Sequence, residues 1–323
     1  MDESDILIIG AGIAGLLCGR TLADAGREVR ILDKGRGFGG RMATRRMGNG
    51  RIDHGAQYFT ARDPRFRALV EDWLEAGVIR EWFRHLPEDN HPAGYPRYCG
   101  VHGMTDLPKH LATGLDVRRS ERVESLRREG GRWIAQSAEG REFSAKMLVV
   151  TAPLPQALDV LETSGEDFAG ADLAALRAVC YEKGLAVLAL LDGPSGLPGF
   201  GGLKLSGGPL TWIADNQLKG ISPEAHTVTL HAAPDYAEAH WDSDDAVRVP
   251  PLLEAAGPHL RSAVLEHSAH RWGFAFPCNP WRELLFANDA LNLVLAGDAF
   301  GGPRIEGAAL SGLAAADRIL SNS

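Results

Sequence analysis

The stretch Ile-Leu-Ile-Ile-Gly-Ala-Gly-Ile-Ala-Gly at residues 6–15 decides the fold of this 323-residue chain. Its four apolar residues predict a strand, and apolar residues at helical spacing follow from Gly12 to Leu22. A second strand is predicted at residues 29–33, Val-Arg-Ile-Leu-Asp. Strand, tight turn, helix and strand within the first 33 residues predict a βαβ unit, and therefore a parallel sheet.

Gly10, Gly12 and Gly15 form a GxGxxG pattern between that strand and that helix. Glycines at these positions let backbone N–H groups and the helix dipole approach a pyrophosphate. Asp33 stands at the end of the second strand, where a carboxylate accepts hydrogen bonds from ribose hydroxyls and would repel a 2′-phosphate. The pattern predicts a site for FAD or NAD rather than NADP.

Composition and charge exclude several classes of partner. A net charge of -8 and a pI of about 5.8 argue against nucleic acid, because phosphate binding needs a basic face. The acidic residues 1–5 do not resemble a signal peptide, and no apolar run approaches the roughly 20 residues of a membrane span. Neither the four separated cysteines nor the eleven scattered histidines form a metal-binding motif. We expect a cytoplasmic protein with reduced cysteines, without a metal and without nucleic-acid or membrane partners.

A glycine-rich run at residues 33–44, Asp-Lys-Gly-Arg-Gly-Phe-Gly-Gly-Arg-Met-Ala-Thr, favours an FAD site over an NAD site. It resembles the GGR segment of the flavin amine oxidase superfamily, in which glycine backbone and an arginine flank the diphosphate. A positive side chain with free N–H groups suits that role. Near the C-terminus, Gly297-Asp298 and the residues up to Ser311-Gly312 resemble the second FAD motif of the same superfamily.

The resemblance becomes more specific at residues 52–62, which are similar to the flavin-side segment of renalases and their bacterial relatives. Residues 212–216, the strand at 230–232 with Trp241, and residues 270–277 resemble further renalase stretches. The chain departs from that family at Gly273, where a larger polar residue is expected, at Phe274, where tyrosine is expected, and in an insertion at residues 85–98.

From the motifs and the resemblance we expect one noncovalently bound FAD, because no cysteine stands where covalent members of the superfamily attach flavin. The residues expected to bind it are Gly10, Gly12, Ile13, Ala14, Gly15, Asp33, Lys34, Gly40, Arg41, Met42, Gly55, Ala56, Gln57, Tyr58, Val123, Thr151, Ala152, Pro153, Gly297, Asp298, Glu306, Gly307 and Ala308.

The fold class predicted is α/β, with a Rossmann-type FAD-binding domain and a second α+β substrate domain that contains an antiparallel sheet. The first domain is expected at residues 1–62, 103–158 and 270–323, and the second at residues 63–102 and 159–269. The later elements expected are helices at 66–75, 104–115 and 307–320, and strands at 121–127, 132–137, 146–150, 210–214, 227–232 and 291–296.

The resemblance to renalases implies oxidation of the 2- and 6-dihydro isomers of NAD(P)H, with hydride transfer to flavin N5 and reoxidation by O2 to give hydrogen peroxide. The pocket residues expected are Gln57, Tyr58, Thr60, Trp212, Asn216, His231, Arg271 and Trp272. Two alternatives remain open, an FAD-dependent oxidase of amines or another small molecule, and a flavin-binding protein without turnover. The sequence does not determine the oligomeric state.

Overall fold

The computed structural model describes residues 2–86, 89 and 91–322, and these form two compact units. Unit 1 comprises Met1–Gly40, Pro108–Cys180 and Phe276–Ser323, and unit 2 comprises Arg41–Leu107 and Tyr181–Ala275. Within the 85–98 insertion, residues 87, 88 and 90 lie outside the described residues. Each unit is therefore assembled from segments that are distant in the sequence.

Unit 1 contains an eight-stranded sheet whose central strands are parallel. Its main order is β16-β17-β10-β1-β2-β7, and β8 and β9 extend from β10 as an antiparallel hairpin. Leu7, Ile8, Ile31 and Leu148 are fully buried on these strands. The strands are β1 (Asp2–Ile9), β2 (Val29–Asp33), β7 (Asp116–Arg119), β8 (Val123–Glu129), β9 (Arg132–Ser137), β10 (Glu142–Val150), β16 (Phe286–Asn288) and β17 (Leu293–Leu295).

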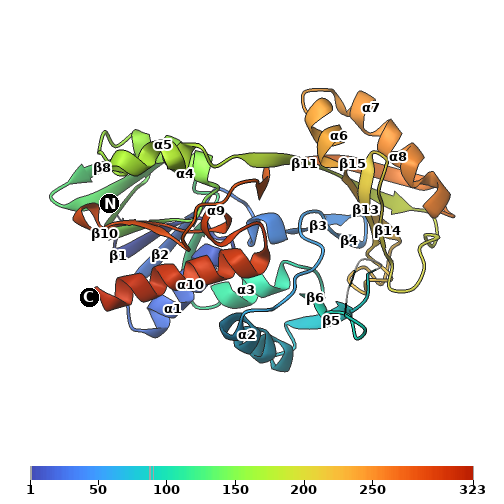
Figure 1. The fold of residues 1–323 in the computed structure, drawn as a ribbon, viewed down its shortest axis with the longest axis horizontal. Helices are drawn as coiled ribbons and strands as arrows, with labels where there is room; N and C mark the ends of the chain where they lie inside the picture. The colour runs from blue at the N-terminus through green and yellow to red at the C-terminus, as the bar shows by residue number, and fades with distance from the viewer. Residues whose placement is uncertain (1, 87–88, 90, 323) are drawn as a thin grey trace. The chain divides into compact units, whose positions relative to one another are not determined.

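Helices cover both faces of this sheet (Figure 1). The long helices α1 (Ile13–Asp24) and α10 (Ile305–Ser321) pack together on one face, and α4 (Leu154–Glu162) and α5 (Leu173–Arg177) lie on the other. The four-residue helix α9 (Asp298–Gly301) precedes α10. This arrangement confirms the predicted Rossmann-type parallel sheet.

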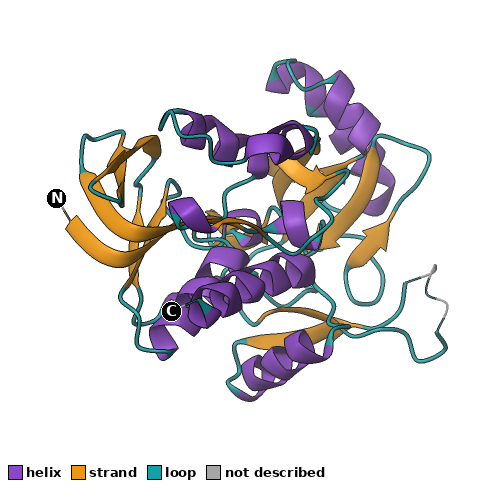
Figure 2. Cartoon of the chain, turned by 60° about the vertical axis from the view of Figure 1, so that its left-hand side comes forward, coloured by secondary structure: helices purple, strands orange, loops and turns teal. Residues whose placement is uncertain are grey.

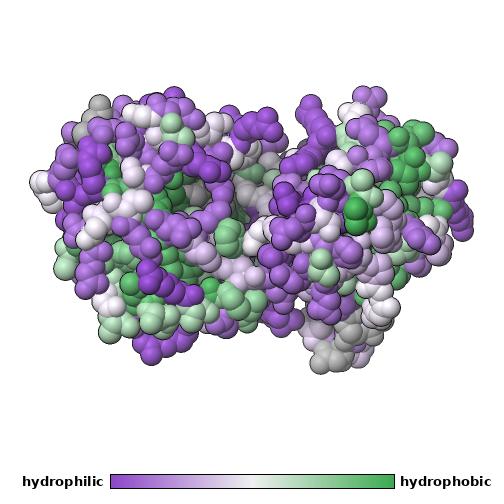
Figure 3. All heavy atoms as spheres, turned by 90° about the horizontal axis from the view of Figure 1, so that it is seen from above, coloured by the Kyte–Doolittle hydropathy of each residue, from purple (hydrophilic) through white to green (hydrophobic). Residues whose placement is uncertain are grey.

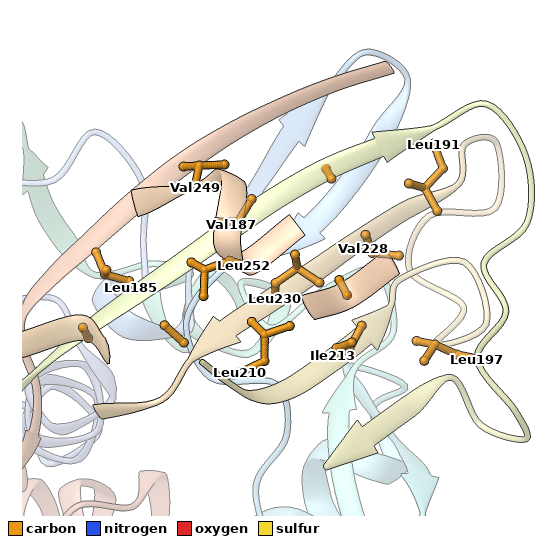
Figure 4. Packing of buried hydrophobic residues seen from close by; sticks show 14 residues of the cluster. Leu185, Val187, Leu191, Leu197, Leu210, Ile213, Val228, Leu230, Val249 and Leu252 are labelled. Atoms are coloured by element: carbon orange, nitrogen blue, oxygen red, sulfur yellow. The ribbon is translucent and has the colours of Figure 1, made fainter. Parts of the chain in front are cut away.

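Unit 2 is built on a five-stranded sheet of order β12-β13-β14-β11-β15. The pairs β12–β13, β13–β14 and β11–β14 are antiparallel, which confirms the predicted sheet type. Leu185 and Val187, alternate residues of β11, pack in one hydrophobic cluster with Val249 and Leu252 of the helical segment at residues 245–256 (Figure 4). The strands are β11 (Tyr181–Leu191), β12 (Gly202–Lys204), β13 (Leu210–Asp215), β14 (Thr227–Ala232) and β15 (Val264–Pro277).

Two smaller hairpins and several short helices complete unit 2. Helix α2 begins at Pro64, after Asp63 whose carboxylate accepts hydrogen bonds from the N–H groups of Arg65 and Phe66, and it lies beside β5 (Figure 2). The hairpins are β3 (Thr44–Met47) with β4 (Gly50–Asp53), and β5 (Ile79–Phe83) with β6 (Arg97–Gly100). The helices are α2 (Pro64–Glu75), α6 (Pro234–Ala239), α7 (Asp245–Arg248) and α8 (Pro250–Ala256).

Several element boundaries differ from those predicted, and the predicted helix at 104–115 differs most. Helix α3 covers Asp106–Ala112 and contains the boundary between the two units. It begins late because the Met104 N–H group donates to the Asp53 carboxylate at 2.9 Å. Strand β17 is shorter than predicted, strand β8 begins two residues later than predicted, and β12 was not among the predicted strands.

Across the part of the chain that the structure describes, no helix is both long and apolar enough to span a bilayer. Hydrophilic residues are spread over the face shown in Figure 3, with apolar residues gathered in smaller groups among them.

Candidate functional site

Two of the three glycines of the GxGxxG turn, Gly10 and Gly15, are in close contact with other protein atoms. Gly10 has a φ of +112°, and a Cβ there would lie 2.6 Å from the Thr151 Oγ1 atom. A Cβ at Gly15 would overlap the carbonyl oxygen of Gly10. Both residues are therefore required by the fold of unit 1 itself, whether or not a ligand is bound.

Gly12 is different, because a Cβ at this position would meet no protein atom within 4 Å. Gly12 is the N-cap of the 12-residue helix α1, whose N-terminus has no side-chain cap and no acidic residue in its first turn. Such a helix end offers N–H donors and a partial positive charge. The turn therefore leaves an open cradle at a helix N-terminus, which fits the pyrophosphate of a dinucleotide.

Asp33 lies at the end of β2, next to this turn. Its two carboxylate oxygens accept hydrogen bonds from the N–H groups of Ala11 and Gly35, each at 2.6 Å. Burial raises the pKa of Asp33, and these two hydrogen bonds oppose that change. Each oxygen keeps a lone pair for a ribose hydroxyl, whereas the neighbouring Lys34 is exposed and donates to Gln156.

The other predicted cofactor residues of unit 1 gather near the carboxyl ends of its parallel strands. Thr151, after β10, donates through its N–H group to Ile9, and a Cβ at Gly297 would lie 3.5 Å from its carbonyl oxygen. Asp298 is buried at the start of α9. The strands β1, β10 and β17 thus end together, which is where ligands bind in open α/β sheets. Of the remaining residues, Ala152 and Pro153 precede α4, Glu306, Gly307 and Ala308 are buried in the first turns of α10, and Val123 begins β8.

Within unit 2, the predicted cofactor residues of the GGR segment and of residues 55–58 are bonded to each other. The Arg41 carbonyl oxygen accepts a hydrogen bond from the Ala56 N–H group at 2.8 Å. The Arg41 guanidinium donates to the carbonyl oxygens of Phe274 and Ala275. Gly40 is the last residue of the first segment of unit 1, and Met42 is buried beside Thr105, whose hydroxyl donates to the Met42 carbonyl oxygen. The arginine of the GGR segment is therefore held in place by backbone on both sides.

A buried ion pair, Asp53 with Lys219, lies beneath residues 55–58 and was missed by sequence reasoning. Their charged atoms are 2.7 Å apart, and both side chains are 0% exposed. Lys219 also donates to the Gln57 carbonyl oxygen at 2.6 Å. Asp53 accepts from the Thr44 hydroxyl and the Met104 N–H group. The two partners are 166 positions apart, and no local pattern marks Lys219.

Two predicted pocket residues, Gln57 and Asn216, are buried members of the same polar network. Gln57 donates from Nε2 to the Asp53 carbonyl oxygen at 2.7 Å. Asn216 accepts from the Asp53 N–H group and donates to the Thr229 hydroxyl at 3.2 Å. The amide groups of Gln57 and Asn216 therefore fix the Asp53 backbone.

Tyr58 and Trp212, also predicted for the pocket, meet in an aromatic cluster that we call the ring cluster. Their ring centroids are 5.8 Å apart. The indole N–H of Trp212 is buried and has no hydrogen-bond partner among the described residues. Thr60 lies two residues beyond Tyr58 and is half-buried. The ring cluster consists of Tyr58, Trp82, Phe83, Phe200 and Trp212.

His54 forms the centre of a second group, with His231, His270 and Trp272. The Trp272 indole stacks on His54 with centroids 5.1 Å apart, and its N–H donates to the His54 carbonyl at 3.0 Å. His270 packs edge-on against both rings. Burial lowers the pKa of His54 to about 3, and those of His231 and His270 to about 4. All three imidazoles are therefore neutral at pH 7.

Arg271 lies apart from this group although it stands between His270 and Trp272 in the sequence. Its guanidinium lies over the Trp241 ring, 5.4 Å from the centroid, and donates to the Trp241 carbonyl. Neighbouring residues of a strand point to opposite faces, which explains the separation. Arg271 was predicted for the pocket together with Trp272, but the strand directs its side chain toward Trp241 instead.

Comparisons with known proteins agree with this architecture. A family model described as flavin-containing amine oxidoreductase matches residues 75–320, and one described as an NAD(P)-binding Rossmann-like domain matches residues 8–73. Putrescine oxidase of Kocuria rosea is 34% identical over 70 residues, which cover 22% of this chain and 15% of that enzyme.

Solved structures are similar over the whole chain. Putrescine oxidase bound to putrescine has a TM-score of 0.73 at 13% identity and covers 99% of both chains. A single-residue variant of putrescine oxidase has a TM-score of 0.76 at 14% identity and covers 100% of both. At such identities the likeness establishes a shared fold.

Proposed function

We propose that this chain, which belongs to the flavin-containing amine oxidoreductase family and is an FAD-dependent oxidoreductase, oxidises the 2- and 6-dihydro isomers of NAD(P)H. The chemistry supplied by noncovalently bound FAD is acceptance of a hydride at N5 and delivery of two electrons to O2, giving hydrogen peroxide. The open cradle at Gly12 and the Asp33 carboxylate would hold its pyrophosphate and ribose.

The observation that carries the choice of donor is the lack of a free carboxylate among the predicted pocket residues and their described contacts in unit 2. Asp53 is neutralised by Lys219, and the buried Asp215 is bonded to the Ser195 hydroxyl and to the N–H groups after it. A cationic amine needs an anionic partner when it leaves water. A neutral dihydropyridine ring has no such need.

The group around His54 suits a planar, uncharged donor. Trp272 and His54 stack on each other, and the three imidazoles are neutral. The charge beside this group is therefore the Arg45 guanidinium, at 2.9 Å from His270 Nδ1, which would repel a cationic amine. A dihydronicotinamide already carries its hydride, and its ring becomes aromatic when the hydride leaves. The residues of unit 2 therefore need to position the ring and exclude water more than to move protons.

The proposal is tested by mixing the anaerobic FAD-loaded protein with 6-dihydroNAD in a stopped-flow spectrometer. We expect rapid loss of the oxidised flavin absorbance, followed by peroxide formation when oxygen is admitted. Putrescine and ordinary NADH serve as comparison donors in the same experiment. Bleaching by putrescine without bleaching by either dihydro isomer would overturn the proposal.

A second candidate, an amine oxidase, is supported by the match of residues 75–320 to the flavin-containing amine oxidoreductase family model. The short alignment with putrescine oxidase points the same way. The two candidates predict opposite donor preferences in the stopped-flow experiment, so a single series of donors separates them.

A further inference from the structure

The insertion at residues 85–98 returns to the ring cluster near its end, and we call the described residues 84–86, 89 and 91–97 the strap. The Tyr95 N–H group donates to the Arg84 carbonyl at 2.9 Å, so the ends of the strap are joined. Leu86 is buried against the ring cluster. Leu86 and Arg97 of the strap therefore pack against the cluster that contains Tyr58 and Trp212.

A second buried ion pair closes the strap. Arg97 donates from Nη2 and Nη1 to the two carboxylate oxygens of Asp89, at 2.6 and 2.8 Å. The side chains are 8% and 7% exposed. The Arg97 guanidinium also donates to the carbonyl oxygens of Arg84 and Tyr95, while its Nε–H is buried without a partner among the described residues. A bidentate pair with these further contacts fixes the guanidinium in one orientation.

The fixed guanidinium lies against two rings of the ring cluster. Its Cζ atom is 5.7 Å from the centroid of Tyr58 and 5.2 Å from that of Phe83. The ammonium group of Lys219 lies 4.6 Å from the centroid of Trp82. Cations of the protein therefore already occupy aromatic faces that would attract an alkylammonium ligand. Their carboxylates, Asp89 and Asp53, are bonded to these cations and are not free for the ligand.

We propose that Arg97 is a specificity-determining residue, which the strap holds on the faces of Tyr58 and Phe83 so that positively charged amines are excluded from the ring cluster. The inference rests on the proposed function, because it takes Tyr58 and Trp212 as pocket residues. The inference adds a physical reason for the proposed donor class, because the aromatic faces that could bind a cationic amine are already covered by Arg97 and Lys219.

The test compares a double variant, Asp89→Asn with Arg97→Gln, with the wild-type holoenzyme. Removing both charges together leaves no unpaired buried ion, so the variant should fold. Putrescine binding is measured by its perturbation of the flavin absorbance spectrum under anaerobic conditions. We expect putrescine affinity to rise about tenfold or more in the double variant, and the rate of flavin reduction by 6-dihydroNAD to change less than threefold.

The control is Glu162→Gln with Arg177→Gln, which removes an exposed ion pair outside the strap and the ring cluster. It should leave putrescine affinity unchanged. Unchanged putrescine affinity in a double variant that binds FAD normally would overturn the role of Arg97. Failure of the wild-type protein to oxidise either dihydro isomer would overturn the proposed function instead, and the two failures are read from different proteins.

Discussion

The glycine turn of unit 1 and the Asp53–Lys219 network of unit 2 are built in opposite ways. The turn is made of backbone from one short stretch, residues 10–15, and its chemistry comes from N–H groups and a helix end. The network joins side chains from β3, β4 and the loop after β13 to the backbone N–H group of Met104, and these segments are far apart in the sequence. The first region is local and the second is tertiary.

This difference has an energetic consequence. A backbone cradle exposes few groups that depend on a distant partner, so most substitutions elsewhere leave it intact. A buried ion pair depends on both partners, because removing one leaves an uncompensated charge in a medium of low polarity. The network should therefore dominate the stability of unit 2, and the turn should dominate cofactor affinity.

The largest effect is expected for Lys219→Met, which leaves the buried carboxylate of Asp53 without its cation. We expect a loss of about 3–5 kcal/mol in the free energy of unfolding. Urea denaturation followed by circular dichroism, with FAD in excess, measures it. Lys183→Met, which removes a partly exposed pair with Glu238, is the control and should cost less than about 1 kcal/mol. Equal effects of the two substitutions would contradict this account of the network.

A smaller and more selective effect is expected from alanine at Gly12. The residue has a φ of -75°, which alanine tolerates, and its Cβ would meet open space, so the apoprotein should keep its stability. The added methyl group occupies the cradle, and FAD affinity, measured by flavin fluorescence, should fall at least tenfold, or about 1.4 kcal/mol.

Gly15→Ala provides the contrast for Gly12→Ala, because its Cβ would overlap the Gly10 carbonyl within the protein. We expect it to destabilise the apoprotein by about 1–3 kcal/mol. If Gly12→Ala lost as much apoprotein stability as Gly15→Ala, the open cradle would not exist as described.

The last effect concerns the slope of stability against pH, not its size at neutral pH. The pKa of His54 is about 3 in the folded protein and about 6.5 in an unfolded chain, so the unfolded chain binds more protons between these values. The stability contribution of His54 is complete above pH 6.5 and is lost as the pH falls toward 3. His231 and His270, with pKa values of about 4, act in the same direction.

The free energy of unfolding should therefore fall less steeply between pH 6.5 and 4 in His54→Gln than in the wild-type protein. The difference in slope should correspond to about one fewer proton taken up on unfolding. Urea denaturation at half-unit pH intervals measures the slope. The exposed His110→Gln is the control and should leave the slope unchanged. An identical slope in His54→Gln and the wild-type protein would show that His54 is not neutral in the fold.

Elements with strong local signals could be predicted from the sequence. The strand at Val29–Asp33 and the strand at Arg132–Ser137 have the bounds that their residue patterns indicated. The parallel sheet, the antiparallel sheet and the C-terminal helix followed from period and order. Helix α3 was predicted too long, since the hydrogen bond from Met104 to Asp53 is a tertiary contact that helical spacing does not reveal.

The amino-acid sequence by itself determined the fold class, the family and the cradle, because GxGxxG and its flanking strands act through the backbone of adjacent residues. Only the tertiary structure decided how the side chains of unit 2 combine. It joined Lys219 to Asp53, placed Arg97 on Tyr58 and separated Arg271 from Trp272. Partners of buried charges and rings are chosen by chain segments that meet only after folding, and no local spacing records those meetings.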